Sequence, residues 1–216
     1  MTPKSTLPRL WLALAALLVL ADLLRIGLAV PLYPASSERV FLAGAALAML
    51  LFAQLLPNRT PANHVAWATL VMALTLWLIA CGKGQPPGDN VMLIPLSAQL
   101  FFFSRPLSIG LCLLAALTLL TSRDDKALTQ LGRWYALVAG IAFLGGEIVG
   151  SFWSFYGWGR TWSWSAHFFF SALVYLLLIL VFHLPKRWLG RERDMALAQA
   201  ALVAAIALTN LGYKLW

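Results

Sequence analysis

The sequence has few charged residues and few of the side chains that form conventional reactive centres. Lys, Arg, Asp and Glu make up 11% of its 216 residues, whereas in soluble domains they make up about a quarter. Only three histidines and two cysteines occur. Cys81 and Cys112 are far apart and form no CxxC motif, so neither a thiol–disulfide motif nor a zinc site is indicated. We expect both to pack as small apolar residues.

Long apolar runs fill the sequence instead. Hydrophobic residues make up 61% of the chain, and its mean hydropathy is +0.80. Seven stretches approach the roughly 20 residues that cross a bilayer, and none shows the alternation of a membrane barrel. We therefore predict an all-α, polytopic helical membrane protein in which residues 1–216 form a single integral membrane domain. The spans are expected at about 10–30, 40–56, 64–81, 106–121, 134–152, 166–184 and 195–212.

Two segments allow alternative interpretations. The first apolar run follows Lys4 and Arg9, as a secretory signal peptide would, but it is too long and its cleavage site is weak, so we expect a helix. The segment VMLIPLSAQLFFFSRP, at 91–106, is apolar but contains two prolines and Arg105. We expect it either as a half-buried helix along the outer interface or as the first part of a long, kinked fourth span.

Basic residues predict the orientation of the spans, because Lys and Arg concentrate in cytoplasmic loops. One set of helix ends carries ten of them and the other carries five, with Arg25 inside the first span. We therefore expect the N-terminus inside, the C-terminus outside and residues 151–165 on the outer face. We attribute the net charge of +8 to this topology and to contact with anionic lipid, and we see no nucleic-acid-binding pattern. The larger set is Lys4, Arg9, Arg59, Arg123, Lys126, Arg133, Lys186, Arg187, Arg191 and Arg193, and the smaller is Arg39, Lys83, Arg105, Arg160 and Lys214.

Charged residues inside the spans need a partner or a function, because lipid does not solvate them. Asp22 and Arg25 lie three residues apart on the first helix and are expected to pair on one face. Glu147 lies near the outer end of its span, where it could reach water, Arg160 or a bound cofactor. It lies within a GxxxG motif at 146–150, which we expect to let another helix approach closely.

The three histidines are the candidate metal ligands. His64 and His183 lie at the expected cytoplasmic ends of the third and sixth spans, at one membrane level, as bis-imidazole ligation of a haem iron requires. His167 opens the sixth span at the outer end. About 24 Å of helix separates it from His183, so these two cannot bind one metal. A lone histidine at a helix end is more often an interfacial side chain, and that alternative stays open.

The densest aromatic segment is GSFWSFYGWGRTWSWSAHFF, at residues 150–169. Tryptophan commonly anchors membrane proteins at the interface, but such anchors scatter over many helix ends, whereas these are contiguous. We therefore predict a flat aromatic platform at the membrane surface, suited to a planar apolar macrocycle, with Arg160 placed to meet a propionate. The platform comprises Trp153, Trp158, Trp162 and Trp164, and Gly157 and Gly159 allow the backbone to turn sharply.

This segment resembles the signature of the cytochrome c assembly protein family, the haem-handling proteins of the CcsA and CcmC type. Their pattern, W-x4-W-G-x-Y/W-W-x-W-D, lies outside the membrane between two spans. The resemblance covers residues 130–216 best and includes the flanking stretches FHLPKRWLGR and LTNLGY. Ser165 stands in place of the signature aspartate, and no histidine precedes the segment on the outer side. The matching positions are Trp153, Trp158, Gly159, Trp162 and Trp164.

The resemblance implies a function in cytochrome c biogenesis at a bacterial inner membrane. The protein would bind or present haem (haem b) at the outer face for an apocytochrome c, together with other assembly-complex membrane subunits, as part of a holocytochrome c synthase (haem lyase) system. His183 matches the family's transmembrane histidine, and His64 is the candidate partner. The alternative is a non-catalytic, haem b-bearing or structural subunit of a larger membrane complex, which Ser165 and the missing outer histidines favour.

Overall fold

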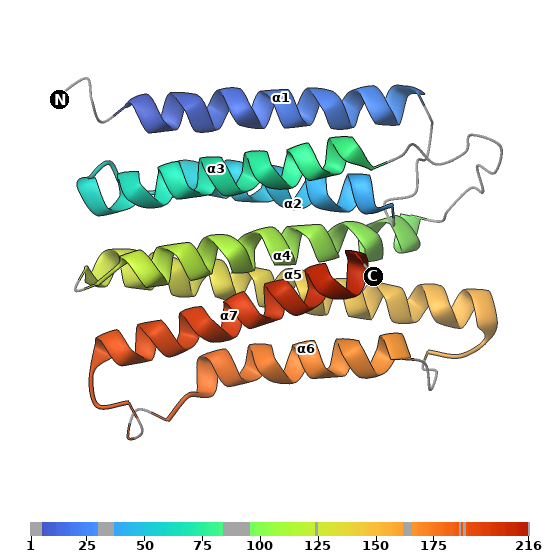
Figure 1. The fold of residues 1–216 in the computed structure, drawn as a ribbon. Coiled ribbons are helices and arrows are strands. Elements are labelled where there is room, and N and C mark those ends of the chain that lie inside the picture. The colour runs from blue at the N-terminus through green and yellow to red at the C-terminus, as the bar shows by residue number, and fades with distance from the viewer. Residues whose placement is uncertain are drawn as a thin grey trace.

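The structure is a computed structural model that describes residues 6–29, 37–83, 96–123, 125–161, 166–185, 187 and 189–215. Within these residues the chain forms seven α-helices and one short 3-10 helix, without strands, and Figure 1 shows the α-helices running back and forth as a bundle. The elements are α1 (Leu7–Ala29), α2 (Glu38–Phe52), η2 (Ala53–Leu55), α3 (Thr60–Gly82), α4 (Leu96–Thr121), α5 (Lys126–Trp158), α6 (Ala166–His183) and α7 (Glu192–Leu215).

Six of these helices, α1 to α5 and α7, are long and apolar enough to cross a membrane. The remaining helix, α6, is apolar, but its segment Phe168–His183 is shorter than the other six. The predicted all-α fold is thus confirmed, and the apolar helices are those of a multi-pass membrane protein.

Two helices are longer than the hydropathy of the sequence suggests. α4 begins at Leu96 and continues through Pro106, which agrees with the second interpretation of the 91–106 segment. α5 begins at Lys126 because the Asp125 carboxylate accepts hydrogen bonds from two backbone N–H groups of its first turn, each at 3.1 Å. At its other end α5 extends to Trp158, past the expected end of the span at 152. Polar and aromatic turns therefore continue both helices beyond their apolar centres.

α4 lies at the centre of the bundle and packs against α2, α3, α5 and α7. α4 approaches its neighbours most closely at glycines, which lie either on α4 itself or on the neighbouring helix. A Cβ at Gly110 would overlap the backbone carbonyl of Ala45 on α2, and one at Gly150 on α5 would overlap the ring of Phe101. Gly146 likewise leaves no room for a Cβ, so the close approach predicted for the GxxxG motif is confirmed.

An acidic side chain joins the first three helices. Asp22 of α1 accepts hydrogen bonds from Arg39 of α2 and from the Trp77 indole of α3, both at 3.1 Å. The predicted pair with Arg25 also forms, but at 3.4 Å and with an Arg25 side chain that is 72% exposed. Arg39 is only 8% exposed, so it is the principal partner. Arg39 lies in the first turn of α2, at a helix end as predicted, and its side chain folds back into the bundle.

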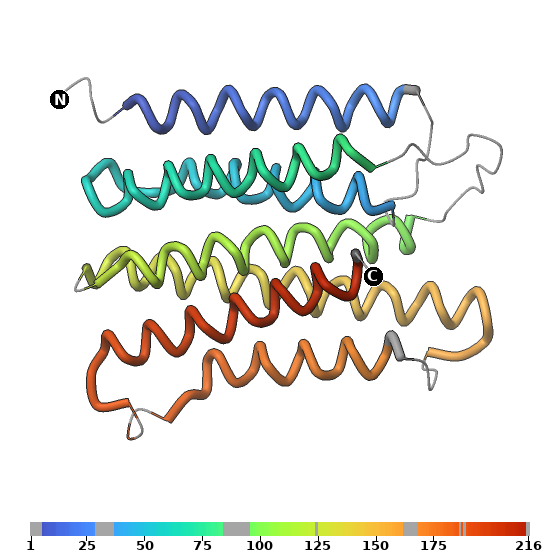
Figure 2. The backbone as a smooth tube through the Cα atoms, viewed as in Figure 1, coloured from blue at the N-terminus to red at the C-terminus, as the bar shows by residue number. Residues whose placement is uncertain are grey.

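The two ends of the bundle differ in their chemistry, and Figure 2 shows that successive helices run in opposite directions between them. The end at which α3, α5 and α7 begin carries Arg59, Arg123, Lys126 and Arg193, and we refer to it as the basic end. The opposite end, at which α5 ends, carries Phe155, Tyr156 and Trp158 as exposed rings, and we refer to it as the aromatic end.

Replacing Asp22 by Asn tests the junction of α1, α2 and α3. The neutral amide leaves the buried Arg39 without its counter-charge, and removing one partner of a buried ion pair costs about 3–5 kcal/mol. We expect the free energy of unfolding, measured by denaturant titration in detergent, to fall by about that amount. Arg25→Gln is the control, because this arginine is largely exposed. Equal losses in both variants would contradict the assignment of Arg39 as principal partner.

Candidate functional site

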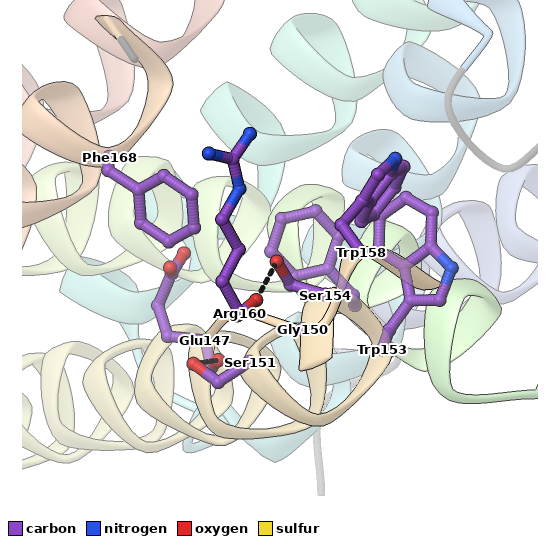
Figure 3. A pocket seen from close by; sticks show the side chains of 9 residues that line it. Glu147, Gly150, Ser151, Trp153, Ser154, Trp158, Arg160 and Phe168 are labelled. Atoms are coloured by element: carbon purple, nitrogen blue, oxygen red, sulfur yellow. Dashed lines mark hydrogen bonds between the residues drawn. The ribbon is translucent and has the colours of Figure 1, made fainter. Parts of the chain in front are cut away.

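A pocket of about 270 Å³ opens at the aromatic end, against the last turns of α5. Figure 3 shows Glu147 and Phe168 on one side of it and the two tryptophans, Trp153 and Trp158, on the other, with the Arg160 side chain between them. Phe101 of α4 completes the aromatic lining. The pocket therefore combines apolar ring faces with one basic and one acidic side chain.

The two tryptophans that line the pocket differ in burial: Trp153 packs against the bundle, and Trp158 is exposed. Trp153 and Trp158 meet edge to face, with ring centroids 5.1 Å apart. Trp153 is half-buried and packs against Phe101 and Phe102 of α4, at 6.1 Å and 5.7 Å between centroids. Trp158 is 61% exposed. The bundle thus holds Trp153 in place, and Trp153 in turn supports a ring that a ligand can cover.

The end of α5 positions Arg160 at the mouth of the pocket. Gly159 adopts the left-handed conformation, with φ of 69°, and its N–H donates to the Phe155 carbonyl at 2.8 Å. The Ser154 hydroxyl donates to the Arg160 carbonyl at 2.7 Å, which holds the departing chain against the helix. The turn predicted at Gly159 is therefore confirmed.

The prediction of a sharp turn at Gly157 was wrong. Gly157 lies inside α5, and residues 151–158 are helical instead of part of the connection between spans. The physical reason is that the helix ends only where a left-handed residue and its hydrogen bonds can terminate it, at Gly159. The Trp153 and Trp158 rings are consequently spaced by helical geometry.

Glu147, which lines the pocket, belongs to an ion pair between α4 and α5. Arg105 of α4 donates to the Glu147 carboxylate of α5 and, at 3.1 Å, to the Ser171 hydroxyl of α6. Its guanidinium carbon also lies 4.8 Å from the ring centroid of Phe101 and 4.7 Å from that of Phe143. Of the three possibilities for Glu147, the contact is thus with a cation, but that cation is Arg105 and not Arg160.

The structure does not bring His64 and His183 together. His64 lies in the second turn of α3 and His183 ends α6, both at the basic end and both exposed. Yet α3 packs against α1, α2 and α4, whereas α6 packs against α5 and α7, and Figure 1 shows these two helices on opposite sides of the bundle. His183 Nδ1 also bonds the Ile179 carbonyl of its own helix at 2.9 Å. Shared ligation of one haem iron stays a prediction that this arrangement does not support.

Other predicted residues cannot be placed at the pocket. Trp162, Trp164 and Ser165 lie outside the described residues, and His167 is in the first turn of α6 with its side chain outside them. Within the part of the chain that the structure describes, no group of three or more His, Cys, Asp or Glu side chains could hold a metal ion. Arg105 and Phe101 could not be placed near the tryptophans from the sequence, because both lie in the apolar 91–106 segment that allowed two interpretations.

Comparison of the chain with protein-family models, with curated proteins and with solved structures finds no match in any of the three. The resemblance to the cytochrome c assembly family therefore stays a prediction that depends on the tryptophan and glycine pattern.

Replacing Gly150 by Ala tests how the pocket depends on helix packing. The new methyl group would overlap the Phe101 ring, which supports Trp153. Overpacking costs about 1–3 kcal/mol, so we expect a lower thermal unfolding temperature in detergent and a shifted tryptophan emission spectrum. Gly145→Ala is the matched control, because nothing lies within 4 Å of its added Cβ. If the Gly150 variant is as stable as this control, α4 and α5 are not held as closely as described.

Proposed function

We propose that this protein handles haem in cytochrome c biogenesis and binds or presents it at the outer face of a bacterial inner membrane. The observation that carries the proposal is the clustering of Trp153, Trp158 and Arg160 around one pocket at the end of a long apolar helix. The tryptophan and glycine pattern of residues 153–164 supports it, because it resembles the signature of a family that presents haem outside the membrane.

The side chains of the pocket fit the chemistry of haem. Aromatic rings can stack on a flat apolar macrocycle. Arg160 can pair with a propionate, and the hydrogen bond from Ser154 holds the Arg160 backbone beside the helix. A macrocycle larger than the cavity would extend from its mouth over the exposed face of Trp158. The haem supplies the chemistry when bound, and this chain binds and orients its edge.

The iron would need a ligand from outside the described pocket lining, which contains no histidine. His167 is the candidate, because it immediately precedes Phe168, whose ring lines the pocket. A haem held mainly by its face and propionates suits transfer to an apocytochrome c or to another membrane subunit. A haem b-bearing or structural subunit stays the alternative, and Ser165 in place of the signature aspartate favours it.

The proposed topology has seven spans, with the N-terminus inside and the aromatic end outside. Arg39 and Arg105 lie inside the bundle, so subtracting these two from the five outer basic residues leaves three against ten. The asymmetry among loop charges is therefore larger than the sequence count alone indicates, which supports the proposal.

Reporter fusions test this topology. Alkaline phosphatase fused after residue 161 should be active, because that position is proposed to lie outside. Fusion after residue 190 should be inactive, because the α6–α7 connection carries basic residues on the inner side. A fluorescent reporter that matures only in the cytoplasm should show the opposite pattern. The reverse result would place the aromatic end inside and exclude presentation of haem at the outer face.

Haem titration tests the site itself. Trp158→Ala removes an exposed ring with little effect on the bundle, and losing one ring contact of about 1 kcal/mol should weaken haem binding about fivefold. Trp134→Ala is the matched control, since this tryptophan lies on the same helix and is 57% exposed, against 61% for Trp158. Haem is titrated into each purified variant in detergent, and the change in absorbance measures its haem affinity.

Equal haem affinity of the two variants would contradict the proposed platform and leave these tryptophans as interfacial anchors. Incubation of the haem-loaded protein with an apocytochrome c separates the proposed function from its alternative. Loss of haem to the acceptor supports a handling function, whereas retention supports a subunit that keeps its haem.

A further inference from the structure

A second pocket, of about 460 Å³, lies at the basic end, where α4 ends and both α5 and α7 begin. The described residues of its lining include four cations and one carboxylate, a net charge of +3 (four minus one). The side chains of Thr129 and Gln130 add hydrogen-bonding groups. The charged residues are Arg123, Lys126, Arg133, Glu192 and Arg193.

One of these cations already has partners. Arg133 Nε donates to the Gln199 amide oxygen at 2.9 Å, and its Nη2 donates to the Glu192 carboxylate at 3.3 Å. These bonds link α5 to α7 and neutralise Glu192, the acidic side chain among the described residues of the lining. The other three, Arg123, Lys126 and Arg193, have no hydrogen bond or ion pair within the described residues. The net positive charge of the pocket therefore lies on side chains that make no ion pair among the described residues.

The backbone at Arg123 is unusual. Arg123 has φ of 45°, and within the described part of the chain it is the one residue other than glycine with a positive φ. This conformation is unfavourable for an L-residue with a side chain, and it occurs where a surrounding structure or a ligand requires it. Here it turns the chain between α4 and α5 and places an arginine in the lining of the pocket.

An exposed apolar stripe continues from the pocket along α5. Starting from Gln130, each next position lies four or three residues further on, so these side chains share one helix face. All five are exposed in the bundle, and in a membrane span such a face contacts lipid chains. The stripe consists of Trp134, Leu137, Ile141, Leu144 and Ile148.

We propose that this pocket binds the phosphate headgroup of an anionic phospholipid whose acyl chains lie along the apolar stripe of α5. Arg123, Lys126 and Arg193 neutralise the phosphate, and Gln130 lies at the junction between headgroup and chains. A free phosphate would use the same cations but would leave the adjoining stripe uncovered, so the combination favours a lipid. This site is at the opposite end of the bundle from the aromatic pocket and does not depend on the proposed haem function.

Binding of phosphatidylglycerol to the purified full-length protein tests the site. The double variant Lys126→Gln/Arg193→Gln removes two cations that have no partner in the described structure, so the fold should be unaffected. Each cation beside an anionic phosphate contributes roughly a factor of five, so we expect about 25-fold weaker binding. The control is Arg187→Gln/Arg191→Gln, which removes two basic residues of the α6–α7 connection that lie outside the pocket lining.

The outcomes distinguish a specific lipid site from a general attraction between basic residues and anionic lipid. Weakening confined to the pocket variant supports the site, whereas equal weakening in both double variants overturns it. Thermal unfolding without added lipid should be the same for both, which excludes a folding defect as the cause. Inorganic phosphate at the same concentration should not compete with phosphatidylglycerol, and phosphatidylcholine should bind no more tightly to the protein than to the pocket variant. Effective competition by inorganic phosphate would overturn the assignment to a lipid.

A second measurement locates the acyl chains. Phosphatidylglycerol with brominated chains should quench the fluorescence of Trp134, which is the first residue of the stripe. The quenching should be reduced in Trp134→Phe and in the pocket variant, and retained in the Arg187→Gln/Arg191→Gln control. Quenching that is unchanged in Trp134→Phe would show that the chains lie elsewhere and would overturn the proposed placement.

Discussion

α4 can approach its neighbours closely only where a side chain is absent, and the rest of the bundle is arranged around those approaches. Lipid supplies no hydrophobic force between helices, so association depends on backbone proximity at small residues. Gly110 of α4 meets the α2 backbone, and Gly132 and Gly150 of α5 admit Leu119 and Phe101 of α4. The last contact also builds the aromatic pocket, because the ring seated against Gly150 supports Trp153. The contact at Gly150 therefore both packs α4 against α5 and positions the tryptophan of the pocket.

Charges inside the bundle are paired between helices instead of along one helix. Asp22 and Arg39 join α1 to α2, and Arg105 and Glu147 join α4 to α5. Each pair leaves no net charge in the apolar region, so burial costs less than it would for a single ion. The basic end is different, because several of its cations have no counter-charge among the described residues. The buried arginines are therefore paired, whereas Arg123, Lys126 and Arg193 at the basic end make no ion pair among the described residues.

Hydropathy predicted the fold class and the approximate position of the helices, because the length of an apolar run reports directly on membrane crossing. It missed the ends of α5, since Asp125 caps through side-chain hydrogen bonds and Gly159 terminates by its backbone conformation. The i, i+3 spacing correctly placed Arg25 beside Asp22, but the stronger partners lie on other helices, and local spacing carries no information about them. For the same reason the membrane level of His64 and His183 could be predicted from the sequence, whereas their separation across the bundle could not.

The length of α5 has a consequence for how its pocket is reached. Its 33 residues span about 50 Å, whereas the hydrocarbon core of a bilayer is about 30 Å thick. Tilting accommodates only part of this mismatch, so turns at the ends of α5 extend beyond the acyl chains. Because Trp158 lies in the last turn, the pocket that it lines is at the edge of the span and not at its apolar centre.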